Sequence, residues 1–144
     1  MFAHQAMSRN TSNALAGVYR TVGVETGVNG ASPHRLVAML FEGFGDAVNQ
    51  ARSAMQRREI EGKCTAIGRA VRIVDEGLRA NLDIAAGGTL ALNLSALYAY
   101  IALRLTHANL HNDPAALDEC ASLIDPVRSA WAAIDPNTPK EKVQ

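Results

Sequence analysis

The stretch from Gly87 to Leu110, GGTLALNLSALYAYIALRLTHANL, decides how this chain folds, because its apolar residues recur at helical spacing on two faces. A surface helix normally has one apolar stripe and a charged back. The first stripe here consists of Leu90, Leu94, Leu97, Ile101, Leu105 and Ala108. The second lies about 160° away on the helical wheel and consists of Leu92, Ala96, Ala99, Leu103 and Leu110. Both stripes cannot face the same core, so one of them is expected on the surface.

The same region raises the question of a membrane span. Residues 84 to 103 form a window without a charge that is long enough to cross a bilayer. The window contains Gly87, Gly88, Thr89, Asn93 and Ser95, which leave an apolar segment shorter than the ~20 residues that a spanning helix needs. We therefore expect a helix of a soluble bundle. The N-terminus lacks the basic start and apolar core of a secretory signal, so the expected location is the cytoplasm.

Length and charge restrict the class of protein further. A chain of 144 residues is expected to form one domain with a single core. Its 14 lysines and arginines balance its 14 aspartates and glutamates. No global positive field attracts nucleic acid or an anionic membrane, so a function that depends on a basic groove is disfavoured.

Capping patterns and apolar spacing predict four long helices. Ser32 followed by Pro33 predicts the start of a helix that ends near residue 58. A second helix follows after a few residues and breaks at the glycines in positions 87 and 88, and a third runs from there to about His111. Asp113 and Pro114 repeat the pattern of cap and proline, which predicts a fourth helix that ends near residue 134.

These elements determine the expected fold class. Long amphipathic helices with short connections must be antiparallel neighbours, because a short loop cannot return the chain to the far end of a helix. We expect an all-α protein, an antiparallel up-down four-helix bundle with a short N-terminal helical arm. The bundle covers residues 32–134, residues 1–31 form a flexible arm with a short helix, and residues 135–144 form a disordered tail.

Each helix has a predicted inner seam. In the first helix the seam is Leu36, Leu40, Phe44, Ala47, Ala51 and Met55. In the second it is Ile60, Cys64, Ile67, Val71, Val74 and Leu78, and in the fourth Leu117, Cys120, Ile124, Val127, Trp131 and Ile134. Both cysteines are thus expected as buried, inert thiols that form no disulfide. Trp131 is expected at the edge of the core, where its indole N–H finds a partner.

A row of mostly small residues lies two positions beyond the seam of the second helix. It consists of Ala66, Ala70, Ile73, Gly77, Ala80 and Ile84. If it faces outward beside the second stripe of the third helix, the two rows form an apolar trough for another chain's helix. Alanine is also simply the best helix former at exposed positions, and this alternative suits the second helix. In the third helix the leucines favour a binding surface, because each exposed leucine loses roughly 1.5 to 3 kcal/mol of the free energy that its burial would provide. A homodimer seam would cover them equally well.

The sequence contains no pattern typical of catalysis or metal binding. No glutamate is followed three residues later by a histidine, which excludes the di-iron site of four-helix bundles. His107 and His111 share a helical face, but the sequence places no further ligand beside them. We therefore expect no enzyme, no metal and no cofactor.

Two segments resemble the flagellar secretion chaperone family FliS. The first is YRTVGVETGVNGASPHRL at residues 19–36, followed by MLFEG at 39–43. The second is GLRANLDIAAGGTLALNLSALYAYIALRLTHANLHND at 77–113, with Ala130 and Trp131 near the end of the fourth helix. The resemblance covers roughly residues 19 to 134, and its motifs agree in order and spacing.

This resemblance implies a partner, which the periodicity alone does not identify. Members of the family are antiparallel helical bundles that hold the C-terminal segment of flagellin in the cytoplasm. They block premature polymerisation and deliver the subunit to the flagellar type III export apparatus. The partner segment lies in apolar grooves as helical and extended pieces, and the N-terminal arm can cover part of that surface. An export-gate component and an anti-sigma factor are implied as further partners.

The resemblance also extends the candidate site. Tyr19 matches the tyrosine of the arm, and the third helix carries the family's pattern at Tyr98, Tyr100, Arg104, Asn109 and Asp113. The chain departs from the pattern at Ala99, where an aspartate is usual, and at Leu103, where an arginine often precedes Arg104. The predicted flagellin-binding residues are Tyr19, Ile73, Gly77, Leu92, Ala96, Tyr98, Ala99, Tyr100, Leu103, Arg104 and Leu110. The alternative is a structural homodimer without a client.

Overall fold

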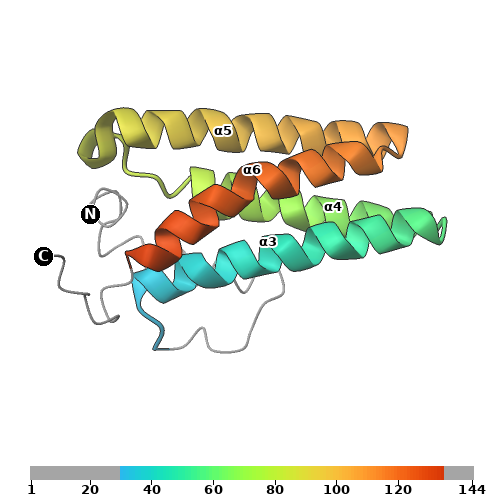
Figure 1. The fold of residues 1–144 in the computed structure, drawn as a ribbon, viewed down its shortest axis with the longest axis horizontal. Helices are drawn as coiled ribbons and strands as arrows, with labels where there is room; N and C mark the ends of the chain where they lie inside the picture. The colour runs from blue at the N-terminus through green and yellow to red at the C-terminus, as the bar shows by residue number, and fades with distance from the viewer. Residues whose placement is uncertain (1–29, 135–144) are drawn as a thin grey trace, which may run out of the picture.

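The computed structural model describes residues 30–134, which form a bundle of helices (Figure 1). The predicted tail from residue 135 lies outside the described residues, and so does the predicted arm up to residue 29, which includes Tyr19. Every regular element between residues 30 and 134 is a helix, and none is a strand. The prediction of an all-α bundle is confirmed.

The second predicted helix is divided into an α-helical and a π-helical part. The described elements are α3 (Pro33–Gln56), α4 (Ile60–Arg72), the π-helix η1 (Ile73–Arg79), α5 (Ile84–His111) and α6 (Pro114–Ala133). The side-chain amide of Asn81 closes the end of η1, because its Nδ2 donates to the carbonyls of Glu76 (2.9 Å) and Gly77 (3.1 Å). These carbonyls would otherwise lack partners at the helix end.

Local capping residues determine where the helices begin. The Ser32 hydroxyl accepts a hydrogen bond from the backbone N–H of Arg35 (3.1 Å), and the Asp113 carboxylate accepts one from Ala115 (3.0 Å). Both predicted starts are confirmed. The third helix begins earlier than expected, at Ile84, because the Asp83 carboxylate caps it through the N–H of Ala86 (3.0 Å).

The expected break at the two glycines is a kink inside α5. Gly88 has φ 55° and ψ −134°, a conformation outside the helical region that residues with a Cβ rarely adopt. The turn before it and the long segment after it therefore form one element that changes direction. The position of the break is correctly predicted, but the chain resumes its helix on both sides of it.

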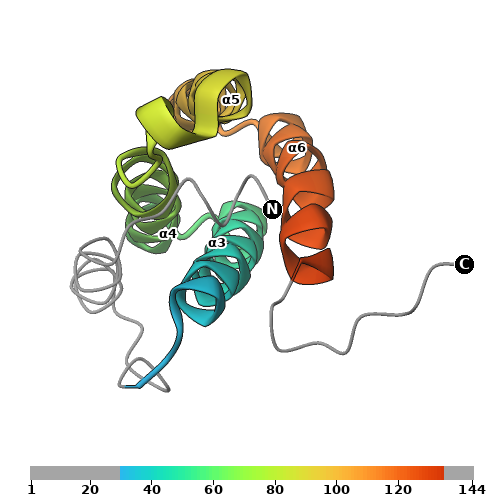
Figure 2. The same cartoon turned by 90° about the vertical axis from the view of Figure 1, so that its left-hand side faces the viewer.

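Neighbouring helices run in opposite directions, as the colours along them show in Figure 1. At one end of the bundle the start of α3 meets the end of α6, where His34 Nε2 donates to the carbonyl of Trp131 (2.7 Å). At the other end Lys63, near the start of α4, donates to the carbonyl of Asn109, near the end of α5 (2.9 Å). Seen from the end, α3 and α5 occupy opposite corners of the bundle (Figure 2).

The core lies between the four corners and receives side chains from all of them. Its largest fully buried members are Leu36, Leu40, Phe44, Val48, Ile67, Ile73, Val74, Ile101, Leu105, Leu117 and Cys120. The predicted seam of α3 is buried except for Met55, which is partly buried. The predicted inner stripe of α5 is buried from Ile101 onward, whereas Leu90, in the turn after the kink, is 40% exposed.

The predicted inner face of the second helical region is confirmed for Ile67, Val74 and Leu78, which are buried, and Val71 packs against the core as well. The prediction is wrong for the first part of the row. Ile60 is 71% exposed and Cys64 is exposed, so neither belongs to the core. The row of small residues that we expected outside is instead buried from Ala66 to Gly77, including Ile73. Small side chains let α4 and η1 lie close to α3, which packs against α4 along much of its length. The buried face therefore runs through residues 63, 66, 67, 70, 73, 74, 77 and 78.

Two reciprocal hydrogen bonds connect the first turn of α3 with the last turn of α6. Trp131 Nε1 donates to the carbonyl of His34 (2.9 Å), while His34 Nε2 donates to the carbonyl of Trp131. The two rings are stacked with centroids 4.8 Å apart, and both side chains are buried. The prediction that Trp131 lies at the core edge with its indole N–H paired is confirmed.

The two faces of α5 predict opposite effects of the same substitution. Ile101→Glu places a charge at a fully buried position, and we expect it to destabilise the bundle by about 4 kcal/mol or more. Leu103→Glu changes a side chain that is 70% exposed and should alter stability by no more than ~0.5 kcal/mol. Urea unfolding followed by circular dichroism measures both. Similar losses of helicity in the two variants would contradict this division of α5.

Candidate functional site

The outer face of α5 carries a row of exposed apolar side chains, which we call the α5 stripe. It consists of Leu92, Ala96, Ala99, Leu103 and Leu110. Leu92, Leu103 and Leu110 are 57%, 70% and 74% exposed, and Ala96 is exposed, while Ala99 is partly buried. The expectation that the second row of this helix faces outward is therefore confirmed for its leucines. The row extends over ~27 Å of helix, enough for several turns of a partner helix.

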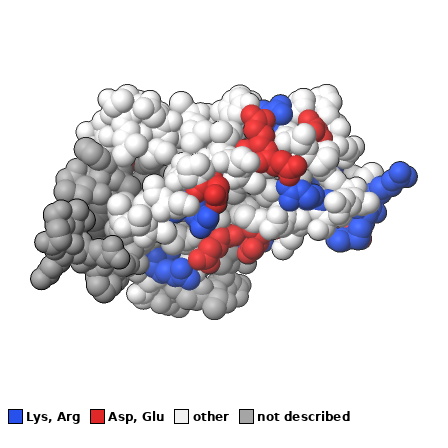
Figure 3. Space-filling view, in the orientation of Figure 1, with Lys and Arg blue, Asp and Glu red and all other residues white. Residues whose placement is uncertain are grey.

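Few charges lie over the first half of α5 on the face of the molecule that Figure 3 shows. Figure 3 shows that charged side chains on this face of the molecule gather mainly over α3 and α6, whereas the first half of α5 is uncharged. An exposed apolar row of this kind is typical of a surface that binds another protein. Isolated exposed leucines are common, but Leu92, Leu103 and Leu110 share one face of one helix.

By length and composition, α5 could also cross a membrane, and only 22% of its apolar window is buried. Its inner residues Ile101, Leu105 and Ala108 belong to the core that α3, α4 and α6 share. We therefore assign α5 to the bundle rather than to a bilayer. The low buried fraction reflects the α5 stripe, which is apolar surface that the bundle itself leaves uncovered.

A polar cluster on the α6 side accompanies the α5 stripe. The Tyr100 hydroxyl donates to Glu119 Oε2 (2.5 Å), and Arg104 Nε donates to Glu119 Oε1 (2.7 Å). Hydrogen bonds from Tyr100 and from Arg104 lower the pKa of the Glu119 carboxyl, and the bond to Glu119 raises the pKa of the Tyr100 phenol. Near neutral pH the carboxylate is ionised, so both donors stay attached to it.

Tyr100 and Arg104 are among the site residues predicted from the sequence, but Glu119 is not. Glu119 follows Tyr100 by 19 positions and lies on another helix. No periodic pattern within one helix indicates that pairing, so only the packing of α5 against α6 reveals it.

Three predicted site residues do not lie on the exposed surface. Tyr98 is only 3% exposed, and burial raises the pKa of its phenol. Ile73 and Gly77 are buried in η1, where they belong to the inner face of the second helical region. The remaining residues on α5, from Leu92 to Leu110, are brought together on one side of the helix. Tyr19 lies outside the described residues.

A buried lysine side chain caps the C-terminal end of α5. Lys63 is 6% exposed, and its Nζ donates to the carbonyl of Asn109 (2.9 Å) and to Asn112 Oδ1 (2.6 Å). A cation suits the C-terminal end of a helix, where unpaired carbonyls and the dipole favour positive charge. Asn112 follows the helix in the left-handed conformation, with φ 50°. Lys63 therefore has a structural role that the apolar pattern did not predict.

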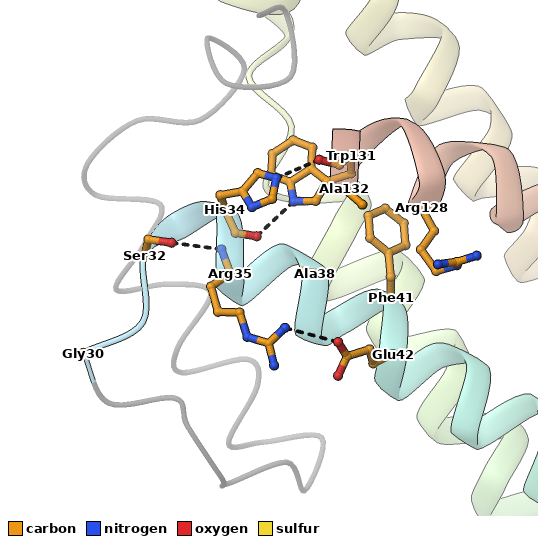
Figure 4. A pocket seen from close by; sticks show the side chains of 10 residues that line it. All are labelled: Gly30, Ser32, His34, Arg35, Ala38, Phe41, Glu42, Arg128, Trp131 and Ala132. Atoms are coloured by element: carbon orange, nitrogen blue, oxygen red, sulfur yellow. Dashed lines mark hydrogen bonds and ion pairs between the residues drawn. The ribbon is translucent and has the colours of Figure 1, made fainter. Parts of the chain in front are cut away.

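A cavity of about 560 Å³ lies at the opposite end of the bundle, between the start of α3 and the end of α6 (Figure 4). Its lining includes the stacked rings of His34 and Trp131 and the exposed ion pair between Arg35 and Glu42 (3.2 Å). The two rings are already hydrogen-bonded to each other's backbone. Among the described residues, no group of three or more potential ligands could hold a metal ion there or elsewhere.

The two cysteines occupy different environments. Cys120 is fully buried, its thiol donates to the carbonyl of Ile101 (3.7 Å), and burial raises its pKa to about 11. It is therefore a packing residue, as expected, and no thiolate nucleophile near neutral pH. Cys64 was also expected in the core, but it is exposed beside Asn109, because the inner face of α4 runs through its neighbour Lys63.

Comparison with known proteins identifies the family. Residues 15–138 match the family described as Flagellar protein FliS. The chain is 42% identical over 118 residues to the flagellar secretion chaperone FliS of Salmonella typhimurium, covering 82% of this chain and 87% of that protein. It is 41% identical over 134 residues to the flagellar secretion chaperone FliSB of Pseudomonas aeruginosa, covering 93% and 98%. It is 40% identical over 113 residues to the flagellar secretion chaperone FliS of Escherichia coli, covering 78% of this chain and 83% of that protein. This chain belongs to the FliS family of flagellar secretion chaperones.

Proposed function

We propose that this chain is an export chaperone that binds the C-terminal segment of flagellin on the α5 stripe. In this role it prevents premature polymerisation of flagellin in the cytosol and delivers the subunit to the flagellar type III secretion apparatus. The observation that carries the proposal is the exposure of Leu92, Leu103 and Leu110 on one face of α5. The family membership supports it, since relatives of high identity are named flagellar secretion chaperones.

The chemistry of binding follows from the surface. A client segment that is disordered when free loses conformational freedom on binding, at a cost of roughly 2 to 5 kcal/mol. Burial along a surface on the order of 1,000 to 3,000 Å² offsets this cost. The exposed leucines supply apolar area, while Tyr100 and Arg104 provide polar contacts at the margin. Binding of this kind needs neither catalysis nor nucleotide hydrolysis.

Three residues of the site predicted from the sequence do not belong to the proposed client surface. Ile73, Gly77 and Tyr98 are buried, so we assign them to the core and not to the client surface. Tyr19 stays a proposed contact of the arm, because its position rests on the family resemblance alone. An export-gate component and an anti-sigma factor also stay proposed partners.

The alternative is a homodimer in which two α5 stripes cover each other. The exposed leucines favour this arrangement as much as a client, because a second copy would bury the same apolar area. Sedimentation of the chain with and without a peptide of the flagellin C-terminal segment separates the two functions. We expect a complex with one chain and one peptide. A constitutive dimer that ignores the peptide would support the alternative.

The client surface is tested directly by Leu103→Glu. We expect this variant to bind the flagellin peptide at least about tenfold more weakly in calorimetry, because an apolar contact is replaced by a charge that must lose its water. The matched control is Gln50→Glu, which adds the same charge at an exposed position of α3, across the bundle from α5. Equal affinities of the two variants would place the client elsewhere on the chain.

The role of the N-terminal arm is tested by deleting residues 1–25. The arm contains Leu15, Val18, Tyr19 and Val22 at the spacing of a short apolar helical face. We propose that it covers apolar surface until the client arrives. The truncated chain should therefore bind more of a hydrophobic dye and scatter more light than the full chain. Unchanged dye fluorescence and solubility would argue against a covering role.

A further inference from the structure

The structure assigns a positioning role to Glu119, which no motif of the sequence indicated. We infer that this carboxylate holds Tyr100 and Arg104 as a fixed polar margin beside the α5 stripe and thereby sets which client segment fits. This inference rests on the proposed function, because it concerns the same surface. It adds a residue of α6 to a site that is otherwise formed by α5.

Two side chains donate hydrogen bonds to the Glu119 carboxylate, and a neighbouring contact holds its backbone in place. One oxygen accepts from the Tyr100 hydroxyl (2.5 Å), and the other accepts from Arg104 Nε (2.7 Å). The next residue, Cys120, is fully buried and donates to the carbonyl of Ile101 in α5. The backbone that carries Glu119 is therefore attached to the helix that carries both donors. A single carboxylate thus orders two long side chains from adjacent turns of α5.

Folding stability alone does not explain this arrangement. The side chains of Arg104 and Glu119 are 27% and 36% exposed, and ion pairs with this access to water contribute little to folding. Their position beside Leu103, which is 70% exposed, points instead to a role in binding. Long side chains that are already ordered lose less conformational freedom when a partner arrives.

The charges of Arg104 and Glu119 also determine which chemical groups of a client can bind at the polar margin. Within the described part of the chain, the terminal amino groups of Arg104 have no hydrogen-bond partner, so they are available as donors. The Glu119 carboxylate already neutralises the guanidinium and repels a second carboxylate. The margin therefore fits a neutral acceptor, such as a backbone carbonyl or the side-chain amide of Asn or Gln. A client helix with its apolar face on the α5 stripe would place one polar flank there.

Glu119→Ala removes both acceptors and tests the inference. We expect its affinity for a peptide of the flagellin C-terminal segment to fall about tenfold in calorimetry, while its urea midpoint stays close to that of the wild-type chain. Glu119→Gln keeps one acceptor oxygen, so its affinity for the peptide should lie between that of the wild-type chain and that of Glu119→Ala. The matched control is Asp118→Ala, which removes the neighbouring carboxylate that pairs with Arg52 of α3, and should bind like the wild-type chain.

A mutant cycle distinguishes positioning from a general structural effect. In a Tyr100→Phe, Arg104→Ala background Glu119 has no donor to hold, so Glu119→Ala should cause no further loss of affinity. Equal losses in both backgrounds would overturn the inference, and so would wild-type affinity of Glu119→Ala. These results leave the proposed function intact as long as the wild-type chain binds the peptide. A wild-type chain that does not bind it would overturn both.

Discussion

A helix in a four-helix bundle can bury only the face that points at its neighbours, and α5 has apolar side chains on more of its circumference than that. It lies between the second helical region and α6, diagonally opposite α3 (Figure 2). Ile101, Leu105 and Ala108 are fully buried on the face that points at the other helices. Leu92, Leu103 and Leu110 are left outside by geometry, since no rotation of α5 could bury both rows at once. The candidate site follows from this constraint.

The parts of the fold that depend on local chemistry could be predicted from the sequence. Ser32 with Pro33 and Asp113 with Pro114 start their helices through side-chain caps that bond within three residues. The outward leucines were also predictable, because a period of 3.6 separates two rows on one helix whatever surrounds it. In both cases the residues that decide the outcome lie close together in the sequence.

The parts that depend on contacts between helices could not be predicted in this way. In α4 two apolar rows compete for the interior, and the sequence does not rank them. The structure buries Ala66, Ala70 and Ile73 of the row with small residues. It also buries Ile67, Val74 and Leu78 of the other row, and it leaves only the start of that row, Ile60 and Cys64, exposed. Lys63 joins the buried face only because the end of α5 supplies two acceptors for its ammonium group. Glu119 was missed for the same reason, since both of its partners lie on another helix.

Apolar area and polar contacts contribute differently to recognition on such a surface. From Leu92 to Leu103 the α5 stripe presents leucine or alanine at successive turns, so a partner helix that moves along this part by one turn would still find a similar side chain beneath it. Burial of apolar area therefore contributes to affinity, but it does little to fix the position of the partner helix along the stripe. A donor at one fixed point changes this, because only one position of the partner places an acceptor opposite it. Arg104, attached through Glu119 to α6, is fixed relative to the bundle and not merely to its own helix. The register of a bound segment would thus depend on the contact between α5 and α6, which the bundle fold itself provides.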